Sequence, residues 1–228
     1  MKNDAMLREV LAIKDNFNQP KGYVMLTELI DKLRLDVAKD KVASPSKKKA
    51  VTALKRYLKN SQYKWMDCVS RREINGETKY IASNGYSLMV LNDSLGAKIF
   101  EDEKKGDYPN FMSQINQIYE SHCYDVDVPT YDEFIKDLKA NPDRVYDNKI
   151  PYIDLELSVA DGLEKELIPK NTHPTLRVNA KYLKAIYEVL GVKELKGYAD
   201  KRGGGAIYLF GEDGECAILL PVVKNDNN

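Results

Sequence analysis

Two Asn-Gly dipeptides, Asn75-Gly76 and Asn84-Gly85, constrain the fold of this chain more than any other feature. They separate three strand-like runs, at 64–73, 78–83 and 86–91. Asn-Gly is the typical sequence of a type I′ turn, because both central residues of that turn need a positive φ. The pattern therefore predicts a meander of three antiparallel strands joined by two tight turns.

The segment before these strands is predicted to be helical. The apolar spacing at Leu7, Val10 and Leu11 favours a short amphipathic helix. Apolar residues at 26, 29, 30 and 33 then follow the i, i+3, i+4, i+7 spacing of a second helix. The polar stretch from Asp36 to Ser46 contains a proline, and it is expected to be a loop.

A third, strongly basic helix is expected to begin at Lys47, with Ser46 as its N-cap. Val51, Leu54 and Leu58 are its inward-facing residues. The remaining positions are mostly basic and have no acidic neighbour within the segment. The basic residues are Lys47, Lys48, Lys49, Lys55, Arg56 and Lys59. The ordinary explanation is a solvated helix face, and the functional one is a surface that contacts nucleic-acid phosphates.

The second half alternates strands and helices. Thr130 and Glu133 form a capping box for a helix over 131–140, and Asn179 and Gly191 are the expected ends of another. Strands are expected at 124–128, 152–159 and 176–178, and a final hairpin at 206–210 and 215–223. This order predicts an α+β fold of antiparallel sheets with packed helices. Because Pro109 interrupts regular structure, we expect two domains, 1–112 and 113–228.

Composition narrows the class of protein. The 228 residues include 35 basic and 35 acidic ones, and this neutrality argues against a protein that coats nucleic acid indiscriminately. No apolar run approaches the roughly 20 residues of a membrane span. Three scattered cysteines, Cys68, Cys123 and Cys216, favour a reducing compartment over a disulfide framework or a zinc site. A cytoplasmic protein without a cofactor is therefore expected.

Two closing segments, Leu176–Ile186 and Gly214–Val223, resemble the end of the bacterial DNA polymerase III β subunit, the DNA sliding clamp family. In that family a strand, a helix with an Asn or Ser cap and a final hairpin follow one another. The hairpin Tyr80–Leu88 and the segment Asp107–Phe111 are similar to further pieces of the family. The resemblance lies mainly in the second half of the chain.

The resemblance implies a function in binding rather than catalysis. A clamp-like chain surrounds duplex DNA and tethers a DNA polymerase or another partner to it, and its helices meet phosphates without reading bases. The implied DNA-contacting residues are the basic ones of 47–59 together with Lys136, Lys139, Lys181 and Lys184. The implied partner-peptide site is Leu220, Pro221 and Val222, which otherwise simply close the core. A two-domain subunit would need three copies to close a ring.

Two other functions fit the same residues. Three helices followed by a hairpin is also the order of a winged helix, with 47–59 as recognition helix and Asn75-Gly76 at the wing tip. A metal-dependent enzyme would use Asp125 and Asp127, which share one face of a strand. The acidic residues that follow them, Asp132 and Glu133, are already explained by their place in the first turn of a helix.

Overall fold

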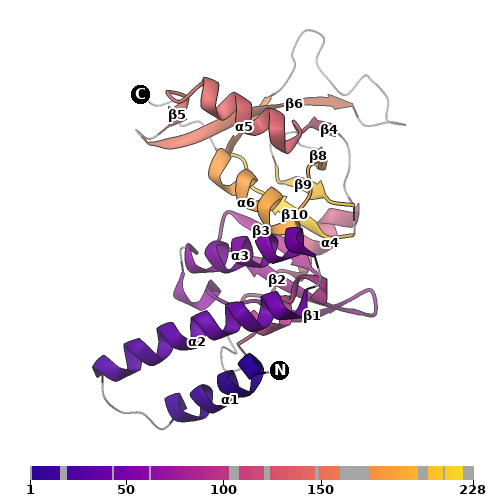
Figure 1. Cartoon of the computed structure of the whole chain (residues 1–228). Coiled ribbons are helices and arrows are strands. Elements are labelled where there is room, and N and C mark those ends of the chain that lie inside the picture. The colour runs from indigo at the N-terminus through magenta and orange to yellow at the C-terminus, as the bar shows by residue number, and fades with distance from the viewer. Residues whose placement is uncertain are drawn as a thin grey trace.

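The computed structural model describes residues 2–15, 20–42, 44–61, 63–102, 108–120, 124–146, 149–159, 175–199, 205–212 and 214–222. In these ranges the chain forms a 10-stranded antiparallel sheet with helices on both faces (Figure 1). The fold is α+β, as the sequence predicts.

The sheet joins the two halves of the chain. Its strands are β1 (Ser70–Ile74), β2 (Glu77–Ser83), β3 (Ser87–Leu91), β4 (Tyr124–Asp127), β5 (Val145–Tyr146), β6 (Ile150–Val159), β7 (Thr175–Asn179), β8 (Lys196–Ala199), β9 (Ile207–Phe210) and β10 (Cys216–Leu219). Their order is β1-β2-β3-β10-β9-β8-β4-β6-β5, and β7 also pairs with β6. Strand β3 thus pairs with β10, and the sheet continues across residue 112. The division into two domains at that residue stays a prediction.

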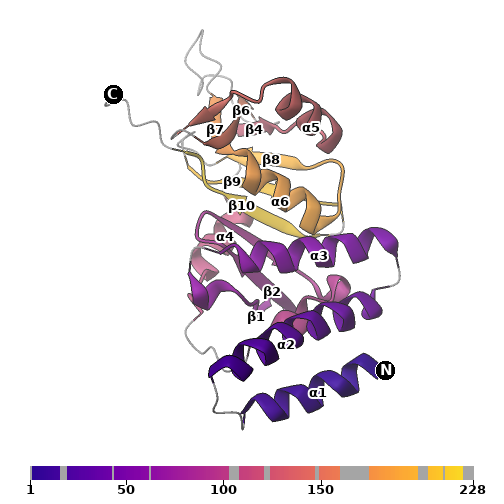
Figure 2. The ribbon, with the colours of Figure 1, turned by 60° about the vertical axis from the view of Figure 1, so that its left-hand side comes forward.

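Six α-helices and three short 3₁₀ helices lie in the described ranges. They are α1 (Lys2–Asp15), α2 (Pro20–Lys41), α3 (Pro45–Lys59), α4 (Met112–Glu120), α5 (Tyr131–Ala140), α6 (Ala180–Leu190), η1 (Lys64–Met66), η2 (Asp93–Leu95) and η3 (Ala97–Phe100). Figure 2 shows α6, α3, α2 and α1 following one another along the molecule.

The central strands are buried on both faces, so they divide two apolar clusters. Met89 and Leu91 of β3 and Ala217 of β10 belong to the larger cluster, which also contains the buried residues of α3 and α6. Their neighbours Leu88 and Val90 belong to a second cluster with Ile115 and Ile118 of α4. Because side chains alternate along a strand, α4 covers the opposite face from α3 and α6.

The predicted meander is confirmed, with one turn as expected and one different. Strands β1, β2 and β3 pair antiparallel in sequence order. Asn75 (φ 51°) and Gly76 (φ 78°) are both left-handed, as a type I′ turn requires. At the second turn only Gly85 is left-handed (φ 93°), and the Asn84 side chain accepts hydrogen bonds from the backbone of Tyr86 and Ser87. Asn84 therefore acts through its side chain rather than its backbone.

The boundaries of the first helices differ from the prediction. Residues 36–41 continue α2 instead of forming a loop, because Val37 and Ala38 are buried against neighbouring elements. The N-cap of α3 is Ser44, whose hydroxyl accepts from the Lys47 backbone at 3.2 Å, and Pro45 occupies the first turn. Ser46 is therefore not the cap. Residues 64–66, expected in the first strand, form η1.

The elements of the second half agree with the sequence patterns. The capping box of Thr130 and Glu133 is present, and hydrogen bonds from the Thr130 side chain and backbone hold the pKa of Glu133 below its usual range. Asn179 caps α6, and Gly191 ends it in the left-handed region (φ 70°). The last strand is shorter than expected: it ends at Leu219, before Pro221.

Two predictions from the composition concern the cysteines and membrane-spanning segments. Cys68 and Cys216 are buried and not joined in a disulfide, while Cys123 lies outside the described ranges. Among the helices described, none is both long and apolar enough to cross a bilayer.

Candidate nucleic-acid interface

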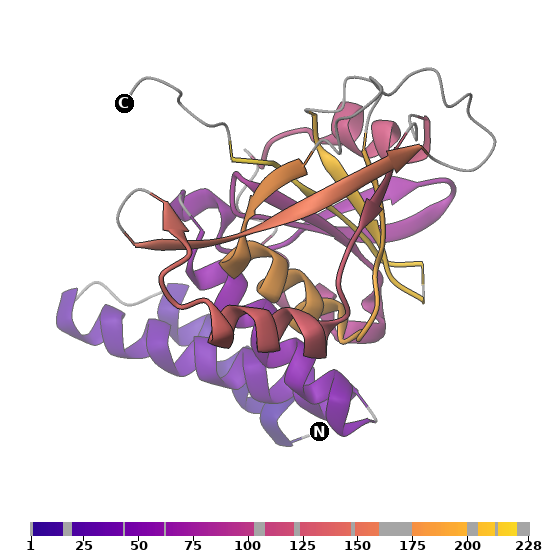
Figure 3. The same ribbon diagram turned by 90° about the horizontal axis from the view of Figure 1, so that it is seen from above.

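Helices α3 and α6 lie side by side on one face of the sheet (Figure 2), and in the view from above α6, in orange, overlaps the purple helices (Figure 3). Each buries an apolar stripe: Leu54 and Leu58 on α3, and Leu183 and Ile186 on α6, are fully buried. Just beyond the end of α6, a Cβ added at Gly191 would lie 3.6 Å from the Cβ of Ala50 on α3, an ordinary contact distance. The faces of α3 and α6 that are not buried point to solvent.

Most of the predicted DNA-contacting residues lie on these outward faces. Lys48, Lys49, Arg56 and Lys59 of α3 and Lys181 and Lys184 of α6 are exposed, and Lys47 is half-buried. The structure therefore brings together basic residues from two segments about 130 positions apart in sequence (Arg56 and Glu188 are separated by 132). A basic surface on adjacent helices is suited to phosphate contacts that do not depend on base sequence.

Two basic residues of α3 have acidic neighbours that the segment itself does not supply. The Lys55 Nζ lies 2.8 Å from Asp31 of α2, and only 18% of the Lys55 side chain is exposed. The Arg56 guanidinium lies 3.5 Å from Glu188 of α6. The prediction that the basic residues of 47–59 have no acidic neighbour is therefore wrong for Lys55 and Arg56. Lys55 is turned toward α2, away from the shared face with α6.

Glu188 lies at the centre of the basic surface. Besides Arg56, its carboxylate has Lys184 Nζ at 3.8 Å and accepts a hydrogen bond from the Tyr131 hydroxyl at 3.4 Å. It is 27% exposed. Sequence reasoning missed it, although its i+4 spacing from Lys184 is a signal for such a pair. Glu188 therefore neutralises part of the charge that α3 and α6 present.

A groove runs between the two helices and is divided by the Arg56–Glu188 pair. One end is a hollow of about 520 Å³ and the other a hollow of about 420 Å³. The first is lined by Ser46, Lys49, Thr52, Ala53, Arg56, Tyr131, Tyr187, Glu188, Gly191, Val192 and Lys193. The second is lined by Ala53, Arg56, Tyr57, Asn60, Asn84, Lys181, Tyr182, Lys184, Ala185 and Glu188. The tyrosines and Lys193 in these linings were not predicted from the sequence.

Helix α5 adjoins this groove at its first residue. The ring of Tyr131 lies 5.5 Å from that of Tyr187 on α6, and the Tyr187 hydroxyl donates to the carbonyl of Pro129. Burial raises the pKa of Tyr187, so the hydroxyl stays a donor. Lys136 and Lys139 are exposed farther along α5. Neither lysine lines the groove between α3 and α6.

The predicted partner-peptide segment crosses from β3 toward β7. The backbone N–H of Leu220 donates to the carbonyl of Tyr86 at 3.0 Å, and that of Val222 donates to the carbonyl of Arg177 at 2.7 Å. Leu220 is 45% exposed, and Pro221 and Val222 are half-buried. These three residues therefore present apolar surface rather than only closing the core.

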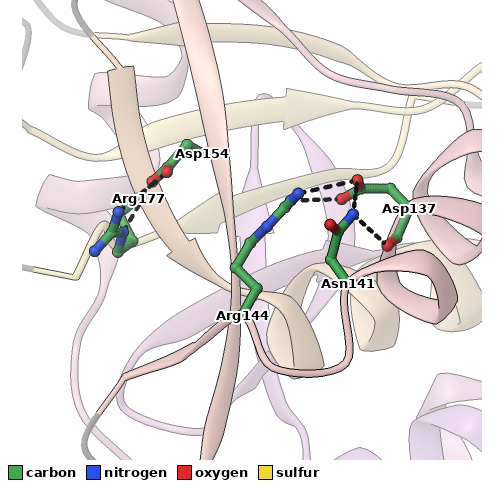
Figure 4. Close-up of polar contacts among 5 residues, drawn as sticks. All are labelled: Asp137, Asn141, Arg144, Asp154 and Arg177. Carbon is green, nitrogen blue, oxygen red and sulfur yellow. Dashed lines mark hydrogen bonds and ion pairs between the residues drawn. The ribbon is translucent and has the colours of Figure 1, made fainter.

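Arg177 is held rigidly beside this segment. Its guanidinium donates to both carboxylate oxygens of Asp154, at 2.9 and 3.1 Å (Figure 4). The same guanidinium lies 3.8 Å from the ring centre of Tyr152. Figure 4 also shows the second bidentate pair, Arg144 with Asp137, at the end of α5. Bidentate pairs fix the orientation of the guanidinium plane.

A stacked tyrosine pair borders the same segment. The rings of Tyr86 and Tyr182 lie 5.6 Å apart and 11° from parallel. Tyr86 is 44% exposed, and burial raises the pKa of Tyr182. With Leu220, this pair forms an apolar and aromatic surface next to the basic groove.

Two of the four carboxylates considered for a metal site, Asp132 and Glu133, have other partners. Asp125 and Asp127 lie on β4, while Glu133 is part of the capping box. Asp132 pairs with Lys193 at 3.4 Å. Within the described ranges, His, Cys, Asp and Glu side chains form no group of three or more that could hold a metal ion.

Comparisons with known proteins found structural likeness only. The structure is similar to a DNA polymerase III subunit β from Borrelia burgdorferi (TM-score 0.49, 10% identity, 78% of this chain and 63% of that one). It is similar to the DNA polymerase sliding clamp of Bacillus subtilis (0.49, 12%, 83% and 63%) and to the Helicobacter pylori β clamp bound to a DNA ligase peptide (0.46, 12%, 75% and 62%). The matched part is less than two thirds of each of these chains. No family model and no curated protein matches the sequence.

Proposed function

We propose that the chain is a sliding-clamp-like scaffold that binds duplex DNA without reading its sequence and tethers a DNA polymerase or another partner to it, in the cytoplasm. The observation that carries the proposal is the basic surface of α3 and α6, assembled from two distant segments on one face of the sheet. Phosphate contacts need positive charge and a rigid support, and the sheet supplies the support. No catalytic group takes part in this function.

The position of α3 favours this function over a winged helix. Helix α3 packs against both α2 and α6, so a single strip of it is open to solvent. A recognition helix enters the major groove, which is about 12 Å wide, and must project from its neighbours to do so. A flat pair of helices instead meets the backbone of DNA.

The partner site is proposed at Leu220, Pro221 and Val222, with the tyrosine pair Tyr86 and Tyr182 beside it. An extended peptide with apolar side chains fits such a surface. The scaffold is proposed to act as a ring of several copies, since a ring keeps hold of DNA without tight contacts.

Neutralising the outward lysines is expected to weaken duplex binding about tenfold or more. The variant carries Lys48→Gln, Lys49→Gln, Lys181→Gln and Lys184→Gln. A lysine that contacts a phosphate releases counterions from the DNA. The slope of log affinity against log salt concentration should therefore become less steep, by about one for each lysine that no longer meets a phosphate. Fluorescence anisotropy of a labelled duplex at several salt concentrations measures both quantities.

The matched control removes four lysines from outside α3, α5 and α6. It carries Lys41→Gln, Lys98→Gln, Lys149→Gln and Lys196→Gln, all exposed, and has the same net charge. Equal binding by both variants would refute the interface. Ring closure is tested separately: a ring stays on circular DNA in a salt challenge and slides off the same DNA once it is linearised.

Glu188→Gln is expected to strengthen duplex binding about three- to fivefold, because it frees Arg56 and Lys184 for phosphates. The amide keeps an acceptor for the Tyr131 hydroxyl, so the packing of α5 on α6 is preserved. The same titration measures the change, with Glu156→Gln on β6 as the control of equal charge. A loss of affinity would contradict the proposed role of this surface.

A further inference from the structure

Exposed apolar side chains are concentrated on the hairpin formed by α1 and α2. Ten large apolar residues are exposed in the described ranges, and six of them lie on these two helices. They are Met6, Ile13, Tyr23, Val24, Met25 and Leu29, exposed by 41 to 72%. Scattered apolar residues are normal on a protein surface, but a concentration of this kind marks an interaction site.

The hairpin is antiparallel and has a small core of its own. The Asn3 side chain donates to Asp40 at 3.1 Å, and the Lys14 ammonium lies 5.1 Å from the ring centre of Tyr23. These contacts join the start of α1 to the end of α2, and the end of α1 to the start of α2. Between the helices lie Leu7, Val10, Ile30, Leu33 and Val37.

Each helix carries one exposed stripe beside this core. On α1 the stripe is Met6, Glu9 and Ile13, and on α2 it is Met25, Leu29 and Lys32. Positions three, four and seven apart share one face of a helix. Seen along each helix from its N-terminus to its C-terminus, the exposed stripe is turned in the same direction away from the buried residues. Because the two helices run antiparallel, equal turns place both stripes on the same side of the hairpin. These six residues therefore form a single surface, the hairpin face.

We infer that the hairpin face binds the hairpin face of a second copy of this chain, forming a four-helix bundle across a two-fold axis. Hairpins with one apolar side commonly pair in this way. With the axis parallel to the helices, α1 of one copy lies across from α2 of the other. The hydrogen bond between Asn3 and Asp40 fixes how α1 and α2 are aligned lengthwise, and the two-fold axis keeps this alignment between the copies. Ile13 therefore falls within about two residues, or about 3 Å along the helix axis, of Leu29 of the other copy.

Charge supports this occupant. In the same arrangement Glu9 falls within about two residues of Lys32 of the other copy, and two-fold symmetry repeats the pair. Opposite charges therefore meet at both edges of the apolar centre. The alternative axis, which sets α1 against α1, brings the two Glu9 side chains toward one another. The pairing is independent of the proposed DNA function, because the hairpin face is separate from the α3–α6 groove.

The first test measures the solution mass of the full chain over the micromolar range by light scattering. The expected species is about 52 kDa, twice the 26.0 kDa of one chain, or an even multiple where a ring also forms. Ile13→Lys places a charge in the apolar centre and is expected to weaken association at least tenfold. Ile13 is 52% exposed, so the monomer keeps its fold, which circular dichroism checks.

The matched control is Val24→Lys, on the same hairpin but outside the hairpin face, which should associate as the parent does. Val24 is 58% exposed and therefore tolerates the change equally well. A monomer at every concentration, or an assembly that Ile13→Lys leaves unchanged, overturns the inference. A trimer that these variants leave unchanged would also overturn the inference, but it would support the proposed ring. The pairing of hairpins and the proposed function can therefore fail independently.

Charge reversal identifies the partner as a second copy. Glu9→Lys alone and Lys32→Glu alone each set like charges against one another and should weaken association about fivefold. The double variant restores opposite charges, so its association should return to the parental strength. Failure of the double variant to recover, with both single variants impaired, would point to a different partner and overturn the inference.

Discussion

Leu54→Ala is expected to lower the free energy of unfolding by about 3–5 kcal/mol. Leu54 is fully buried in the cluster between α3 and the sheet, where Met89, Leu91 and Leu183 also lie. Truncation removes the branched end of the side chain and leaves a cavity that a rigid sheet cannot close. Chemical denaturation in urea, monitored by circular dichroism, measures the change.

The control for Leu54→Ala is Lys59→Ala on the same helix. Lys59 is exposed, so its substitution should change stability by less than about 0.5 kcal/mol. A loss below about 1 kcal/mol for Leu54→Ala would mean that α3 is not packed on the sheet as described. Because the basic surface depends on that packing, duplex binding by Leu54→Ala should fall along with the fraction of folded protein.

Gly197→Ala is expected to destabilise the chain by about 2–3 kcal/mol, through steric crowding rather than through a cavity. Gly197 lies on β8 opposite Val126 of β4. An added Cβ would lie 2.5 Å from the Val128 Cγ2 and 3.1 Å from the Val126 carbonyl oxygen. One of these two close approaches is to backbone, so side-chain movement alone cannot relieve the strain.

A double variant separates the two sources of strain. Val128→Ala removes the Cγ2 atom that crowds the new methyl group, so the double variant with Gly197→Ala should be more stable than the two separate losses predict. Gly211→Ala is the control, since its added Cβ would meet neighbouring atoms at ordinary distances of 3.5 Å or more. If Gly197→Ala cost no more than Gly211→Ala, the pairing of β8 with β4 would have to differ from the one described.

Local signals in the sequence predicted much of the fold. The Asn75-Gly76 turn, the capping box at Thr130 and the ends of α6 depend on a few neighbouring residues, and all are confirmed. The length of α2 was not predictable in this way. Residues 36–41 are polar enough for a loop, and they are helical because Val37 and Ala38 pack against parts of the chain that are distant in sequence.

The candidate site shows the same limit. The basic character of 47–59 is visible in the sequence, but the partners of Lys55 and Arg56 come from α2 and α6. Likewise, the position of Leu220 beside Tyr86 follows from the pairing of β10 with β3, which no local pattern specifies. Residue types predicted which side chains were candidates, and only the tertiary structure shows which of them meet.

The pairing of β3 with β10 has a consequence for the newly made chain. During synthesis β1, β2 and β3 leave the ribosome well before residues 216–219, which then enter the middle of the sheet between β3 and β9. Until that happens, β3 has an unpaired edge with apolar residues on both faces, a state prone to wrong association. The nascent chain therefore carries this unpaired apolar edge from the completion of β3 until residues 216–219 have been made.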